Sequence, residues 1–327
     1  MFYYLARRLA NYALLLFIAV SLAYFIASNA LDPKAAYDLT DPTRDWDALE
    51  RMFIAYNISD TVPVWDRYTI WLGKIFTEWD WGMTPTGASV NSIISIRVWV
   101  SVRLIIIGSI IGMVGGVAVG AWTATKQYSK TDRIVSILAL VIISTPVIVL
   151  ANLLQIGATQ FNVATGTQFF EFTGETGTVG NYFGAALVDR MQHLLLPTIS
   201  MSLTGIASYS RYQRNLMLDT LGADYVRTAR AKGLVKSKAV TRHALRTSLV
   251  PMATFFAFAV ATLFLGATVT EQVFGWHGMG IFGVSSIRGQ DINGTTAVVA
   301  FSGACTLAGA LLSDLLVVVI DPRVRVS

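Results

Sequence analysis

The sequence predicts an all-α integral membrane protein with about six transmembrane helices. Hydrophobic residues make up 54% of the 327 residues, and charged residues make up 14%, against about 25% in a typical soluble chain. Crossing a bilayer takes about 20 residues in a helix, and apolar runs of roughly that length recur along the chain. The expected spans are residues 9–30, 98–123, 134–158, 193–209, 249–270 and 295–320.

The individual spans differ in character. The first is too long for the apolar core of a signal peptide and lacks a small-residue cleavage site, so we expect a retained helix. The fourth is the weakest, because it contains Pro197 and several Ser and Thr residues. The sixth contains the single cysteine, Cys305, which excludes an internal disulfide and favours a packing role. The second carries glycines four residues apart, on one face where a neighbouring helix can approach closely: Gly108, Gly112, Gly116 and Gly120.

The basic residues indicate which side of the membrane each loop faces. Lys and Arg cluster before the first span, between spans two and three, between spans four and five, and after span six. These regions share one side, which carries 16 of the 25 Lys and Arg residues and four of the 20 acidic residues. The positive-inside rule puts that side and both termini in the cytoplasm. The net charge of +5 therefore reflects topology and gives no support to nucleic-acid binding.

The expected organisation follows from the spans and their orientation. Residues 1–31 form the cytoplasmic start and first helix, and residues 32–97 form an extracytoplasmic segment. Residues 98–320 form the transmembrane core with a cytoplasmic loop at 211–248, and residues 321–327 form a cytoplasmic tail.

The extracytoplasmic segment predicts two amphipathic helices. One runs from Asp41-Pro42 to about Ile58, and the other begins at Pro63 and carries aromatic residues at helical spacing. The segment is too short to bury much of a core, so a small cap on the membrane helices is favoured over a ligand-binding domain.

The 211–248 loop is the most informative stretch. It is dense in Ala, Leu, Arg and Lys and predicts a short helix from about Ala223 to Lys232, a turn at Gly233, and a second helix into span five. A glycine just past a helix end adopts the left-handed conformation at little cost. Tyr225, Val226 and Ala229 are expected on one side of the short helix. Such a helix would either dock into a groove on another protein or lie on anionic lipid.

Residues 227–233 read Arg-Thr-Ala-Arg-Ala-Lys-Gly and resemble the coupling-loop motif of ABC importer permeases. That motif is Glu-Ala-Ala, three residues and Gly, and here the Glu and the first Ala are replaced. The longer pattern DYVRTARAKGL, followed by RHALR and Pro251, is similar to the peptide-importer branch and to the B-type member of its permease pair. Further stretches of similarity are RRL at 7–9, LDP at 31–33, YTIWL at 68–72, DWG at 80–82, STP at 144–146, HLLLP at 193–197, EQVFGWHGMG at 271–280 (with His277 where Pro is usual), and DPRVR at 321–325.

The resemblance implies a type I ABC importer-like permease bundle in the cell membrane, transporting di- or oligopeptides. It implies a second, C-type permease, two cytoplasmic ATPases that bind ATP and Mg, and an extracytoplasmic solute-binding protein as partners, besides the lipid bilayer. Closure of the ATPases would draw the coupling helices together and switch the bundle between two packings. The implied coupling helix spans 222–235, with transmission contacts at Asp224, Tyr225, Arg227, Ala229, Arg230 and Gly233.

Catalytic and metal sites are not expected in this chain. The P-loop needs a Gly-rich turn before Lys and Ser or Thr, and the only Gly-Lys pair, at 73–74, lacks that turn. His193, His243 and His277 are far apart in the sequence, which gives a metal site little support. The alternatives are the same machine carrying nickel or another small solute, and an ion-coupled secondary transporter. The latter class commonly shows more spans, internal repeats and helices broken at the midplane.

Four charged residues near the spans are candidates for further roles. Arg103, about two turns into the second span, would either line the translocation pathway or snorkel to the outer headgroups beside Arg97. Asp314 is expected to pair with a basic group or to cap a helix contact, and not to touch cargo. Glu271 and Asp291 flank the last outer loop and are expected to be solvated loop charges, with docking to the binding protein as the alternative.

Overall fold

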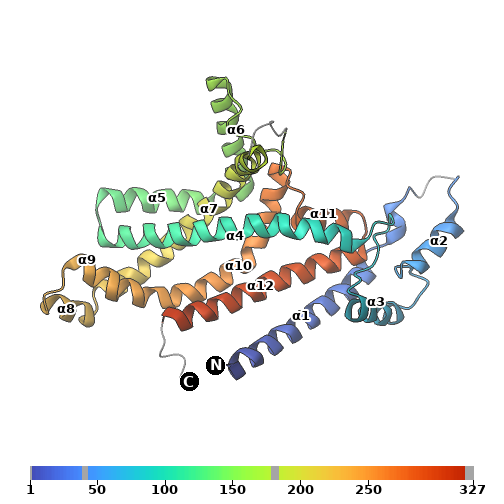
Figure 1. The fold of residues 1–327 in the computed structure, drawn as a ribbon, viewed down its shortest axis with the longest axis horizontal. Coiled ribbons are helices and arrows are strands. Elements are labelled where there is room, and N and C mark those ends of the chain that lie inside the picture. The colour runs from blue at the N-terminus through green and yellow to red at the C-terminus, as the bar shows by residue number, and fades with distance from the viewer. Residues whose placement is uncertain (1, 39–42, 178–183, 321–327) are drawn as a thin grey trace. The chain divides into compact units, whose positions relative to one another are not determined.

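The computed structural model describes residues 2–38, 43–177 and 184–320, and the side chains at 2–5, 257–263, 265, 266 and 320 lie outside that description. Helices account for most of the described backbone (Figure 1). They are α1 (Phe2–Ala30), the 3-10 helix η1 (Pro33–Ala36), α2 (Trp46–Ala55), α3 (Val64–Glu78), α4 (Val90–Thr125), α5 (Lys130–Ser144), α6 (Val147–Thr165), α7 (Ala185–Leu221), α8 (Asp224–Ala231), α9 (Lys236–Ala239), the π-helix η2 (Val240–Leu245), α10 (Arg246–Phe274), α11 (Met279–Arg288) and α12 (Ile292–Ile320).

The chain divides into two compact units. The first comprises Met1–Val102 and His277–Leu307, and the second comprises Arg103–Trp276 and Ala308–Ser327. Helices α4 and α12 each contribute to both units.

Within the described residues, four helices are long and apolar enough to cross a membrane. Three of them correspond to the predicted first, second and sixth spans: Ala6–Ala30, Val90–Thr125 and Ile292–Val319. The fourth is Val147–Thr165. The predicted spans 193–209 and 249–270 lie inside the long helices α7 and α10.

The prediction of one continuous third span at 134–158 is wrong, because the chain breaks at Thr145-Pro146. Proline has no N–H to donate, and it disfavours the helical conformation in the residue before it. Thr145 is accordingly extended, with φ −91° and ψ 126°. Figure 1 shows α6 turning sharply away from α5 at this point.

In the first unit, the segment that follows α1 packs back onto that helix. Tyr24 of α1 is fully buried against α3, and its ring centroid lies 4.6 Å from that of Trp71. The hydroxyls of Ser21 and Tyr68 are 2.7 Å apart. This packing agrees with the predicted cap, and α3 begins after Pro63 as expected. The preceding helix starts later than expected, at Trp46 with Asp45 as N-cap, while Asp41-Pro42 lies outside the described residues.

Glu271 and Asp291 are buried, so the expectation of solvated loop charges is wrong for both. The segment between α10 and α12 is not an open loop: it contains helix α11, with five buried residues. Asp291 accepts a hydrogen bond from the Gly294 N–H at 2.9 Å, and burial raises the pKa of its carboxyl to about 6.

In the second unit, the four glycines of α4 face α7, as their spacing predicts. A Cβ at Gly112 would lie 3.3 Å from the Gly205 Cα, and one at Gly120 would lie 2.4 Å from the Ser210 carbonyl oxygen. The missing side chains therefore let the two backbones approach directly. Helix α7 also packs against α5, α6 and α10, which makes it the central helix of this unit.

Candidate coupling site

The predicted coupling helix is α8, Asp224–Ala231, close to the expected bounds. Eight residues are too few for a stable helix in water, so surrounding contacts must hold this one. Asp224 lies in its first turn and Arg230 in its last, which complements the helix dipole. The N-terminus has no side-chain cap, so most of the fixation comes from the C-terminus and from one buried face.

The C-terminus of α8 is closed by a Schellman motif centred on Gly233. The Gly233 N–H donates to the Arg230 carbonyl at 3.0 Å, and the Leu234 N–H donates to the Ala229 carbonyl at 3.2 Å. This pairing needs a left-handed residue, and Gly233 has φ +90°. The predicted role of this glycine is therefore confirmed in its local geometry.

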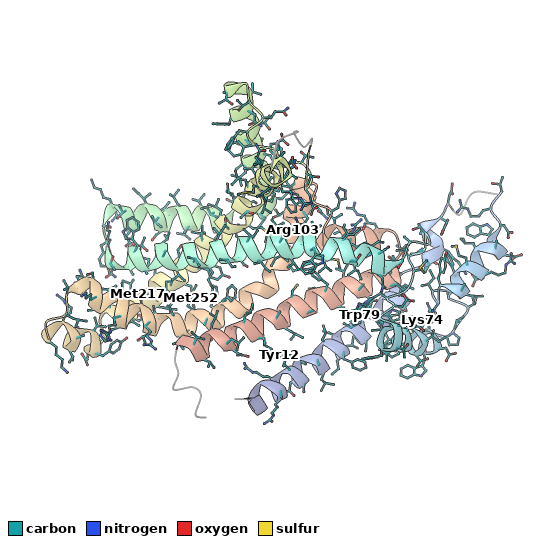
Figure 2. All side chains as sticks on the ribbon, in the orientation of Figure 1. Tyr12, Lys74, Trp79, Arg103, Met217 and Met252 are labelled. Carbon is teal, nitrogen blue, oxygen red and sulfur yellow. The ribbon has the colours of Figure 1, made fainter. Side chains whose placement is uncertain are left out.

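One buried side chain of α8 holds the helix against the rest of the unit. Val226 is 3% exposed and packs with Met217 of α7, Ala124 of α4, and Ala239 and Ala244 of the following segment. Figure 2 labels Met217, which lies near the end of the unit where Figure 1 labels α8. Burying a valine side chain contributes about 1.5–3 kcal/mol, enough to set the orientation of a short helix.

The orientation of α8 decides which of the predicted contact residues a partner protein could reach. Tyr225 is 43% exposed, so it does not share the buried face of Val226 as its spacing suggested. Ala229 is half-buried. The remaining members of the predicted set are exposed: Asp224, Arg227, Arg230 and Gly233. The outer surface of α8 is thus a tyrosine surrounded by basic side chains, with Asp224 at its start.

An ion pair ties α7 to α5 just before α8. Arg214 Nε lies 2.6 Å from Asp132 Oδ1, and Arg214 Nη2 lies 2.8 Å from Asp132 Oδ2. Asp132 also accepts the Tyr128 N–H at 3.0 Å, and its side chain is 5% exposed. The Arg214 guanidinium holds the pKa of the Asp132 carboxyl below its usual range. This bidentate geometry fixes both distance and orientation.

A second polar contact ties α7 to α10. The fully buried Gln213 donates from Nε2 to Ser248 Oγ at 2.7 Å, and Ser248 donates to the Leu245 carbonyl at 2.9 Å. Beside it, Tyr209, Met252 and Phe256 form a buried apolar cluster between the same two helices, with Met252 labelled in Figure 2. Helix α7 is therefore held by polar contacts to both α5 and α10.

Arg103, the predicted pathway residue, lies well inside α4 because that helix begins at Val90. Its Nη2 is 3.4 Å from Glu175 Oε1, and its side chain is 40% exposed (Figure 2). A cargo carboxylate would have to compete with Glu175 for this guanidinium. Arg97, the predicted neighbour in snorkelling, instead lies over the Phe282 ring at 5.3 Å.

The comparisons with known proteins agree with this geometry. Residues 116–326 match the family of binding-protein-dependent transport system inner membrane components. The chain belongs to this family. Its transmembrane helices and its membership make it a multi-pass membrane protein and a transport subunit rather than an enzyme.

Two curated relatives align with nearly the full length of the chain. The chain is 45% identical over 326 residues to the oligopeptide transport system permease protein OppB of Mycobacterium tuberculosis, covering 99% of each chain. It is 30% identical over 325 residues to the dipeptide transport system permease protein DppB of Lactococcus lactis, covering 98% of this chain and 99% of the relative.

A solved structure supports the fold of this family member. An inward-facing form of the MetNI methionine ABC transporter aligns with a TM-score of 0.53 at 17% identity, covering 70% of this chain and 96% of that chain. At this identity the likeness concerns the fold, which is the type I importer permease bundle expected from the sequence.

Several polar contacts of this unit were not predicted. Arg214 and Asp132 are 82 residues apart, and nothing in their spacing predicts the pair. The position of Gln213 in the sequence predicts no partner for it either. The nearest sequence signal is that Gln213 and Arg214 lie within five residues of the end of the expected span 193–209, where a buried polar side chain needs a partner.

Proposed function

We propose that this chain is the B-type, pore-forming subunit of an ATP-driven importer of di- or oligopeptides. Family membership supports import with a binding protein, and the named roles of the two relatives support peptide cargo. In this assignment both termini and the 211–248 loop face the cytoplasm, and residues 32–97 lie outside. A C-type permease, two ATPases that bind ATP and Mg, and an extracytoplasmic solute-binding protein complete the assembly in the cell membrane.

The exposed surface of α8 carries the coupling role. Tyr225, Arg227 and Arg230 are the residue types that most often anchor protein interfaces. In our proposal they contact an ATPase together with Asp224, while Ala229 and Gly233 keep the helix in shape. ATP-driven closure then displaces α8, and the Arg214–Asp132 and Gln213–Ser248 contacts pass the displacement into the bundle.

Charge reversal on α8 tests the coupling role. We would purify the tagged chain from its native cells in mild detergent and identify the co-purifying proteins by mass spectrometry. The double variant Arg227→Glu/Arg230→Glu should lose the ATPases and peptide uptake while still inserting into the membrane. Lys236→Glu is the matched control, because Lys236 is exposed on the same loop but outside α8. Equal ATPase recovery from all three chains would refute the docking surface.

Transport by vesicles tests the assignment as a whole. Vesicles containing the complete assembly should accumulate a labelled peptide only with ATP and the binding protein, and unlabelled peptides should compete. A chain that purifies alone and transports without ATP would be an ion-coupled secondary transporter. Competition by nickel but not by peptides would mean that the chain belongs to an ATP-driven importer whose cargo is nickel.

A further inference from the structure

Three side chains of the kinds that bind metal ions meet at the N-terminal end of α7. Asp189 and His193 lie one turn apart on that helix, and Glu171 comes from the segment after α6. One ligand atom from each residue lies within 4.8 Å of the other two. The Nε2 of His193 is 3.6 Å from Glu171 Oε2, and its Nδ1 is 3.5 Å from Asp189 Oδ1.

The hydrogen bonding of His193 selects which ring nitrogen is free. Nδ1 lies 2.9 Å from the Asp189 backbone carbonyl oxygen, which can only accept a hydrogen bond, so Nδ1 carries the proton. In the neutral form of the ring, the lone pair is therefore on Nε2, on the side of Glu171. A backbone carbonyl holding the second ring nitrogen is the usual way in which a metal-binding histidine is oriented. His193 itself is 3% exposed and has little freedom to turn away.

Among the described residues, the two carboxylates of the cluster have a single basic side chain beside them. The close contacts of Glu171 and of Asp189 with such a group involve only His193. Asp189 is 5% exposed and Glu171 is half-buried. Two acids held this close in a partly buried position favour a cation between them.

Gly177 leaves the space that the cluster needs. A Cβ at this position would lie 2.7 Å from Glu171 Oε2, 3.0 Å from His193 Cε1 and 3.3 Å from Asp189 Oδ1. Its backbone N–H also donates to both Asp189 oxygens, at 3.0 and 3.2 Å, and so fixes that carboxylate. The glycine faces all three side chains, and any other residue would crowd them.

A cavity of about 550 Å³ reaches the cluster from one side and includes Glu171 and His193 in its wall. Asn162, Gln168 and Thr173 add polar groups to the same wall. Water can therefore reach the cluster and supply the ligands that the protein does not.

We propose that Glu171, Asp189 and His193 form a binding site for a divalent transition-metal ion such as Zn²⁺, which ties the 171–177 segment to the start of α7. Zinc takes imidazole nitrogen and carboxylate oxygen at about 2.0–2.1 Å, which places neighbouring ligands about 3.3 Å apart in a tetrahedron. The 3.6 Å separation between Nε2 and Oε2 is close to that value. A water molecule from the cavity completes the coordination.

Zinc binding by the full-length chain tests the proposal. The tag-free chain in detergent would be stripped with a chelator, titrated with Zn²⁺, and analysed for bound metal. We expect one high-affinity zinc per chain, and at least about a tenfold weaker affinity in Glu171→Gln and His193→Gln, since even outer-shell losses cost about 10–100-fold. Glu175→Gln and His243→Gln are matched controls that change the same residue types outside the cluster and should bind zinc like the unaltered chain.

X-ray absorption at the zinc edge keeps the test decisive if His193→Gln does not fold. The bound ion should show one imidazole and otherwise oxygen ligands in the unaltered chain. Absence of stoichiometric zinc, or equal affinity in Glu171→Gln and Glu175→Gln, would overturn the proposal. Because the zinc measurement involves neither peptide nor ATP, a negative result would not affect the importer assignment. A failure of the transport experiments would likewise not affect the zinc site.

Discussion

The two ends of α7 use charged side chains in opposite ways. At the C-terminal end, α8 presents its charges to the surroundings: the Asp224 and Arg227 side chains are 98% and 74% exposed and 3.9 Å apart. At the N-terminal end, the side chains of His193 and Asp189 are 3% and 7% exposed and are fixed by backbone groups. Exposed, weakly paired charges are suited to transient binding of a partner protein, whereas buried and oriented charges are suited to binding an ion.

The body of α7 lies between these two ends, and its packing against α4 is where a substitution should have the largest effect on stability. A leucine at Gly120 would drive side-chain atoms into the Ser210 backbone and should destabilise the protein by about 3 kcal/mol. The melting temperature of the detergent-purified chain measures this. Gly157→Leu in α6 is the control, because a Cβ there meets nothing within 4 Å. Equal melting temperatures for the two variants would show that α4 and α7 do not pack as described.

The ion pair between Asp132 and Arg214 should give the second-largest effect on stability. Asp132→Asn leaves the Arg214 guanidinium with a neutral partner and should cost roughly 2 kcal/mol, while Asp219→Asn on the exposed side of α7 should cost little. Because the pKa of Asp132 is lowered in the folded protein, its stabilisation is present above the unfolded pKa of about 4 and is lost as the pH falls through the folded value. The difference in the free energy of unfolding between the unaltered chain and Asp132→Asn should therefore decrease only at acidic pH. A constant difference from pH 7 to pH 3 would contradict this.

The sequence predicts helices and turns well in this chain because the signals are local. Helical apolar runs, the glycine face of α4 and the turn at Gly233 all follow from residues a few positions apart. The prediction of a continuous helix failed at Thr145-Pro146 because the apolar run extends across the proline, whereas the proline determines the backbone conformation there.

Long-range polar contacts were not predictable in the same way. Glu171 meets His193 across 22 residues, and Arg214 meets Asp132 across 82, and no periodicity encodes such pairs. The three histidines are far apart in the sequence, and their spacing alone gives no sign of the two carboxylates beside His193. The burial of Glu271 and Asp291 depends likewise on how α11 packs, which is a tertiary property.

The turn after α8 gives the third and smaller effect. Gly233→Ala puts a side chain on a left-handed residue and should cost about 1–2 kcal/mol, mostly as fraying of α8. Gly222→Ala is the matched control, since Gly222 has φ −81° and equally open surroundings. Hydrogen exchange of the α8 amides should increase in Gly233→Ala alone. Equal exchange in both variants would mean that the Schellman motif does not hold the helix.

The smallest effect on stability, and the sharpest test of the contrast between the two ends, comes from the exposed pair. Asp224→Asn should leave the melting temperature unchanged, because an exposed pair at 3.9 Å contributes little. Its consequence should appear only with the partner, as an altered salt dependence of ATPase co-purification, since rim charges act mainly on encounter. Asp189→Asn, the same change at the buried end, should instead lower the melting temperature without any partner present. If the two variants behaved alike, exposure would not be what separates a docking surface from an ion site in this molecule.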